Sequence, residues 1–135
     1  MNRLRLLTAA SVVVASALVT TDARAQPQPF SGAGDYQVYC ASCHGASAKG
    51  DGSIAKSLKK RPPDLTQLSK LNAGVFPQDR VSKTVDGRVP GSAHTNSDMP
   101  VWGDVFAKSS ESAGAENVAA RIDTLVRYLQ TLQAK

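Results

Sequence analysis

The stretch VAARIDTLVRYLQTL, residues 118–132, carries the clearest periodic pattern of this 135-residue sequence. Its apolar residues recur at spacings of four, three, four and three, which places them on one face of an α-helix. They are Val118, Ile122, Leu125, Leu129 and Leu132. The pattern therefore predicts a long C-terminal helix.

Upstream, a helix is predicted over 33–43, because Tyr36 and Cys40 are four residues apart, as are Tyr39 and Cys43. A Gly/Ser-rich loop through Gly50-Asp51-Gly52 follows. A short helical stretch is then predicted over 53–60, ended by Pro62-Pro63, which cannot continue a helix. Thr66 is the expected N-cap of a further turn or two.

Pro77 and Gly87 bracket one more predicted helix, whose inner residues include Val81 and Val85. Residues 87–100 are expected to form a loop. No segment alternates apolar and polar residues over a strand's length, and no internal repeat is found. The predicted fold class is all-α with long loops.

The N-terminal residues 1–25 have the features of a signal peptide. Arg3 and Arg5 precede an apolar run from Leu6 to Val19, and Ala23-Arg24-Ala25 supplies small residues for cleavage after Ala25. The run is about 14 residues long, against about 20 for a membrane span, so a retained anchor is the less favoured alternative. No twin arginines are present, which favours the general secretory route.

After cleavage, residues 26–31 would form a flexible, proline-containing leader and residues 32–135 a single domain. Only seven residues of the chain are aromatic, so the side-chain core is thin for this length. Size, apolar run length and the two cysteines disfavour a multidomain enzyme, a membrane channel and a disulfide-stapled mini-protein. Something other than side chains is expected to fill part of the interior.

Formal charge falls from +5 for the whole chain to +3 after removal of residues 1–25. Basic residues nevertheless gather in one stretch, at Lys49, Lys56, Lys59, Lys60 and Arg61. Such a stretch is either ordinary solvated surface or a face that attracts an acidic protein partner. No aromatic or zinc-finger pattern accompanies these charges, so nucleic-acid binding is not expected.

Cys40-Ala41-Ser42-Cys43-His44 has the C-x-x-C-H spacing of covalent c-type haem attachment. The thiols of Cys40 and Cys43 would bind one haem covalently, and the imidazole of His44 would ligate the iron. A thioredoxin-like dithiol is less favoured because no strand is predicted around it. A zinc site would need His94, which lies 50 residues from His44, and a plain disulfide is the remaining alternative.

Met99 is the candidate for the second axial ligand. It is the only methionine left after signal cleavage, and it lies beside Pro100 in a polar loop rather than in an apolar pattern. His94 is the competitor, since imidazole also ligates haem iron. Trp102 either donates to a haem propionate through its indole N–H or caps the core.

These residues resemble class I c-type cytochromes, small single-haem electron carriers, over nearly all of the mature chain. The resemblance rests on Gly32, Tyr36, the attachment motif and the pair Leu125 and Tyr128. It implies that the terminal helices cross, that Gly32 permits their close approach, and that Tyr36 packs near Tyr128. It also implies long loops around one haem, with the carbonyl of Pro62 or Pro63 accepting from the His44 ring.

The expected function is one-electron transfer by a periplasmic protein that is not itself an enzyme. Its partners would be redox proteins such as a dehydrogenase, a cytochrome complex or an oxidase, with no stable membrane insertion after cleavage. Haem would be buried by Leu58, Leu65, Val81, Val85, Ile122 and Leu125, with its exposed edge near Lys49, Lys56 and Lys59. Two alternatives stay open: a five-coordinate haem protein that binds small ligands, and a haem subunit of a dehydrogenase or sulfur-oxidising complex.

Overall fold

The computed structural model describes residues 30–88, 98–109 and 115–135, and within these ranges the chain is an all-α domain without strands. Its α-helices are α1 (Gly32–Asp35), α2 (Ala41–His44), α3 (Gln78–Asp86), α4 (Trp102–Ala107) and α5 (Ala115–Thr131). Short 3₁₀ turns at Ala55–Ser57, Leu65–Gln67 and Lys70–Asn72 lie in the segment between α2 and α3. The predicted fold class is confirmed for these residues.

The first helix is continuous from α1 to α2 and contains one π-helical turn, Tyr36–Cys40. Its first turn is capped by Ser31, whose hydroxyl accepts from the Gly34 N–H at 3.2 Å. The helix predicted over 33–43 is therefore confirmed, but the π turn was not predicted. Such turns insert an extra residue into a helix and are frequent near functional sites.

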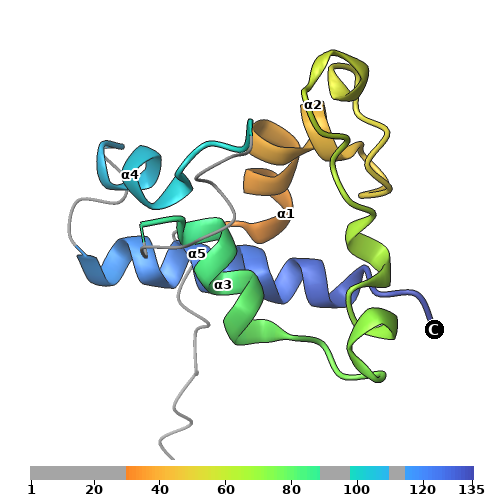
Figure 1. Cartoon of the computed structure of the whole chain (residues 1–135). Coiled ribbons are helices and arrows are strands. Elements are labelled where there is room, and N and C mark those ends of the chain that lie inside the picture. The colour runs from red at the N-terminus through yellow and green to blue at the C-terminus, as the bar shows by residue number, and fades with distance from the viewer. Residues whose placement is uncertain (1–29, 89–97, 110–114) are drawn as a thin grey trace, which may run out of the picture.

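The first helix packs against α5, as Figure 1 shows. A β-carbon at Gly32 would collide with the Thr124 carbonyl of α5, so only glycine fits at this approach without a shift. One turn further on, the rings of Tyr36 and Tyr128 have centroids 5.5 Å apart. The predicted close approach at Gly32 and the predicted packing of Tyr36 near Tyr128 are both confirmed.

Helix α5 lies at the centre of the domain, with α3 and α4 also packed against it (Figure 1). Four residues of its predicted apolar stripe are buried, whereas Leu132 lies beyond the helix end and is half-buried. In α3, Val81 and Val85 are buried and Gly87 ends the helix with φ of 71°. The predictions for both helices are confirmed.

The helix predicted over 53–60 is wrong, because only the 3₁₀ turn Ala55–Ser57 forms there. The preceding backbone donors are used elsewhere: Gly52 N–H donates to the Cys43 carbonyl and Ile54 N–H to the Ser42 carbonyl, both at 3.1 Å. These bonds satisfy carbonyls at the end of the first helix instead of starting a new one.

The cap assigned to Thr66 is also wrong. Asp64 caps the Leu65–Gln67 turn, and its carboxylate accepts from the Thr66 N–H at 2.9 Å and from the Thr66 hydroxyl at 2.6 Å. These bonds lower the pKa of Asp64, the Thr66 hydroxyl most strongly. Helix α4 was not predicted at all.

The C-terminal residues hold the long segment between α2 and α3. The Ala134 N–H donates to the Thr66 carbonyl at 2.8 Å, and Gln133 bonds the Leu65 carbonyl and the Ser69 N–H. Among the described residues, no helix is long and apolar enough to cross a membrane. The signal prediction for 1–25, the leader residues before Phe30 and most of the loop over 87–100 fall outside the described ranges.

Candidate functional site

A cavity of about 400 Å³ lies between the first helix, the segment that follows it, α3, the start of α4 and α5. Its wall is formed mostly by apolar side chains, among them Leu58, Leu65, Leu68, Val81, Val85, Leu125 and Leu129. Volume and apolar lining are those expected of a cofactor site.

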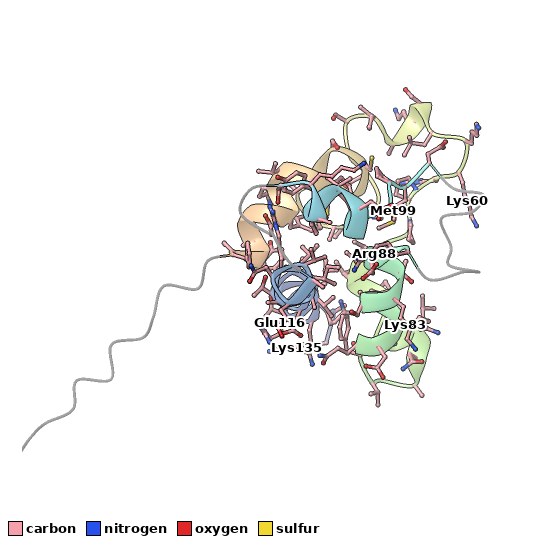
Figure 2. All side chains as sticks on the ribbon, turned by 90° about the vertical axis from the view of Figure 1, so that its left-hand side faces the viewer. Lys60, Lys83, Arg88, Met99, Glu116 and Lys135 are labelled. Atoms are coloured by element: carbon pink, nitrogen blue, oxygen red, sulfur yellow. The ribbon has the colours of Figure 1, made fainter. Side chains whose placement is uncertain are left out.

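The four predicted site residues all line this one cavity. Cys40 and Cys43 are half-buried free thiols on the first helix, and His44 at its end is buried. Met99 reaches the cavity from the segment before α4; in Figure 2 it lies above Arg88, with Lys60 further to the right. The structure thus brings together two thiols, an imidazole and a thioether, whereas the competing ligand His94 lies outside the described residues.

His44 is positioned by the loop that folds back beneath it. The Gly50 N–H donates to the His44 carbonyl at 2.8 Å, and Gly50 has φ of 72°. A β-carbon at Gly50 would collide with the Pro62 carbonyl. Glycine at this position therefore allows the segment Pro62-Pro63 to pack against the loop that contains it. The Pro63 carbonyl then lies 3.4 Å from His44 Nδ1, where it accepts from the ring N–H. Of the two predicted acceptors, the structure selects Pro63.

The same loop is tied to the middle of the first helix. The Tyr36 hydroxyl donates to the Gly45 carbonyl at 2.6 Å. Burial of Tyr36 raises the pKa of this phenol, so it remains a donor at every physiological pH. The helix that carries the thiols and the loop that orients His44 therefore form one unit.

Burial favours the neutral forms of two groups at the site, His44 and Cys40. It lowers the pKa of His44, an effect that the Pro63 carbonyl partly opposes. It also raises the pKa of Cys40 to about 12, with smaller contributions from Asp35 and Cys43. At neutral pH the imidazole is therefore uncharged, the state in which a ring nitrogen can ligate a metal, and the Cys40 thiol is protonated.

An aromatic cluster of Tyr39, Trp102 and Phe106 joins the first helix to α4 beside the cavity. The Tyr39 ring centroid lies 5.5 Å from that of Trp102 and 5.4 Å from that of Phe106, and the last two are 5.9 Å apart. Tyr39 and Trp102 also line the cavity. Trp102 is half-buried and joins α4 to the first helix through these contacts.

Two predictions about the wall need correction. Ile122 does not line the cavity and packs instead into the core, with 2% of its surface exposed. The basic side chains at the cavity are Lys60, Arg61 and Arg80, not Lys49, Lys56 and Lys59. Arg80 and Thr84 also line the cavity and share a helical face with Val81 and Val85, but apolar periodicity does not indicate polar residues.

Within the described ranges, no group of three or more His, Cys, Asp or Glu side chains could hold a metal ion on its own. The potential metal ligands at the cavity come from two parts of the chain: Cys40, Cys43 and His44 from the end of the first helix, and Met99 from the segment before α4. Comparison with family models, curated proteins and solved structures found no match, so the interpretation of this cavity rests on its own residues.

Proposed function

We propose that this protein is a one-electron carrier that holds a single haem c. Cys40 and Cys43 would attach the haem covalently, and His44 and Met99 would be its axial ligands. The observation that carries the proposal is the shared cavity, in which groups 55 residues apart in sequence, His44 and Met99, meet the two thiols.

The fold around the cavity supports a small cytochrome c architecture. The first helix crosses α5 at Gly32 and Tyr36, and a long segment with little regular structure runs from the attachment motif to α3. A cavity of about 400 Å³ in a domain with so few aromatic residues is the space that a buried cofactor would fill. Haem and fold would then depend on each other.

Each residue of the site has a definite task in this proposal. Pro63 orients the His44 ring through its Nδ1–H and leaves the other ring nitrogen free to bind iron. Met99 offers a soft sulfur from a different wall of the cavity. Apolar side chains of α3 and α5 keep water away. When bound, the haem supplies an iron that cycles between ferrous and ferric states, and thioether ligation raises its reduction potential.

Two protein ligands would leave no open position on the iron, so the site would move electrons and would not transform a substrate. We therefore propose redox proteins as partners: a dehydrogenase, a cytochrome complex or an oxidase. Because a signal peptide is predicted at residues 1–25, we propose that the protein is located in the periplasm. Lys60, Arg61 and Arg80 at the cavity favour an approach by acidic surfaces.

The visible spectrum of the protein matured in cells that attach haem c tests the proposal. We expect the ferric form to show the weak far-red band of sulfur-to-iron charge transfer, and carbon monoxide to leave the ferrous spectrum unchanged. Met99→Ala should lose the band and bind carbon monoxide. Val105→Ala, an exposed residue of α4 away from the cavity, is the matched control and should behave like the wild type.

Other outcomes would replace parts of the proposal. Immediate carbon monoxide binding by the wild type would indicate a five-coordinate, ligand-binding haem protein. A stable co-purifying enzyme would indicate a dedicated haem subunit. Absence of covalent haem from the mature protein would remove the carrier function altogether.

A further inference from the structure

A hydrogen bond joins the two segments that face each other beside Met99. The backbone N–H of Lys59 donates to Asp98 Oδ2 at 2.7 Å, across 39 residues of sequence. The acceptor is a carboxylate, which makes this bond stronger than one between neutral groups. Asp98 directly precedes Met99, and both residues line the cavity together with Lys60.

Met99 is held on its other side by α4. Pro100 follows it and has a restricted backbone, and Trp102 then begins α4 and packs its ring against Tyr39 of the first helix. The thioether thus lies between two attachments four residues apart, one at Asp98 and one at Trp102. The Trp102 attachment is hydrophobic and packs against the core, whereas the Asp98 attachment is an exposed hydrogen bond.

We propose that Asp98 is a positioning residue for Met99, and this inference rests on the proposed function. Its carboxylate, held by the Lys59 N–H, keeps the Met99 segment against the segment of Leu58 to Lys60 and so keeps the thioether at the cavity. Loss of the bond would remove one of the contacts that hold the Met99 segment, while the Trp102 contact remains. An external ligand for the iron would then compete more easily with the thioether.

The size of the effect follows from the kind of bond. A hydrogen bond to a charged group is worth more than a neutral one, but Lys59 and Asp98 are both exposed and water competes for them. We expect the population with Met99 displaced to rise roughly threefold to tenfold when the bond is lost. Because an external ligand binds only that population, its apparent affinity should rise by the same factor.

Imidazole binding to the ferric, haem-loaded protein tests the inference, with four proteins compared. Asp98→Ala removes the acceptor and should bind imidazole roughly threefold to tenfold more tightly than the wild type. Asp98→Asn keeps an acceptor oxygen without the charge and should fall between the two. Lys59→Ala removes the side chain but keeps the N–H, and should match the wild type.

Two further measurements separate positioning from general destabilisation. The exchange rate of the Lys59 amide hydrogen should rise in Asp98→Ala, and the urea midpoint should change little. The inference is overturned if Asp98→Ala binds imidazole like the wild type, or if Lys59→Ala shows the same gain. If the wild type lacks the far-red band, Met99 ligation itself fails and the inference fails with it, a result that the band alone identifies.

Discussion

Gly32 has no side chain, and the Thr124 carbonyl of α5 fills the space that a β-carbon would need. The position was recognised in the sequence from a resemblance, but the structure shows the physical reason for it. The contact is made by backbone, which cannot rotate away as a side chain could. The close packing of the two helices therefore requires a residue without a β-carbon at position 32.

Gly32→Ala should lower the free energy of unfolding by roughly 1–3 kcal/mol, because the two helices must separate to admit the methyl group. Urea denaturation of the haem-loaded protein measures it. Gly34→Ala is the matched control, since its β-carbon would lie 3.4 Å from Ser31 and meet no backbone of α5. That variant should be as stable as the wild type or up to about 1 kcal/mol more stable. Equal midpoints for the two variants would contradict the steric explanation.

At the scale of elements, Arg121 of α5 joins three parts of the chain. Its guanidinium donates to both carboxylate oxygens of Asp35 in α1, at 2.7 and 2.8 Å, and to the Ser109 hydroxyl beyond α4 at 3.1 Å. It also lies 4.4 Å from the ring centroid of Phe106. With only 3% of Arg121 exposed, this ion pair is shielded from water on most sides.

Arg121→Gln should lower the free energy of unfolding by about 3–5 kcal/mol, because it leaves the Asp35 carboxylate buried without its partner. Arg127→Gln is the matched control: it removes an exposed ion pair with Asp123 one turn away on the same helix and should cost about 0.5 kcal/mol or less. The difference between the two urea midpoints measures the effect of burial. A similar loss in both variants would show that helix propensity alone explains the change.

Side-chain spacing was sufficient for α5 and α3, since an apolar stripe or a Pro and Gly pair is a local signal. Side-chain spacing was not sufficient over residues 53–60, where the hydrogen bonds of backbone N–H groups determine the local structure. The donors of Gly52 and Ile54 bond the end of the first helix, which no side-chain pattern records. Helix α4 is six residues long, too short for periodicity, although Trp102 and Phe106 are four apart.

The site was only partly visible in the sequence for a similar reason. Cys40, Cys43 and His44 form a local motif, and Met99 was found by elimination. Arg80 reaches the cavity only because α3 packs beside α5, and Asp35 meets Arg121 across 86 residues. Contacts of this kind follow from the tertiary fold, so the sequence could not rank these residues above other charged ones.

At the scale of the whole molecule, filling the cavity with a cofactor would contribute a free energy that is large compared with the stability of a small domain. The cavity is lined mostly by apolar side chains and is partly open to solvent, so a bound cofactor would remove their apolar surface from water. Small domains are stable by only about 5–15 kcal/mol in total. We therefore expect the proposed haem, once bound, to supply a large part of the stability of the domain.

Protein produced without haem attachment should be cleaved by a protease under native conditions at concentrations that leave the haem-loaded protein intact. Its near-ultraviolet circular dichroism, which reports on the packing of Trp102 and the tyrosines, should be weak. Haem-loaded Met99→Ala serves as the control, because the cavity is still filled there. Equal protease resistance with and without haem would show that the domain folds around an empty cavity.

The π-helical turn at Tyr36–Cys40 separates the first helix into two parts whose side chains contact different neighbours. Gly32 and Asp35, before it, contact α5, whereas Cys40 at its end and Cys43 and His44 after it line the cavity. One residue of an α-helix corresponds to about 100° of rotation, so deleting one would turn the thiols away from the cavity. Val38 lies within the turn and is 70% exposed. Many side chains are therefore acceptable at that position, but the position itself cannot be removed.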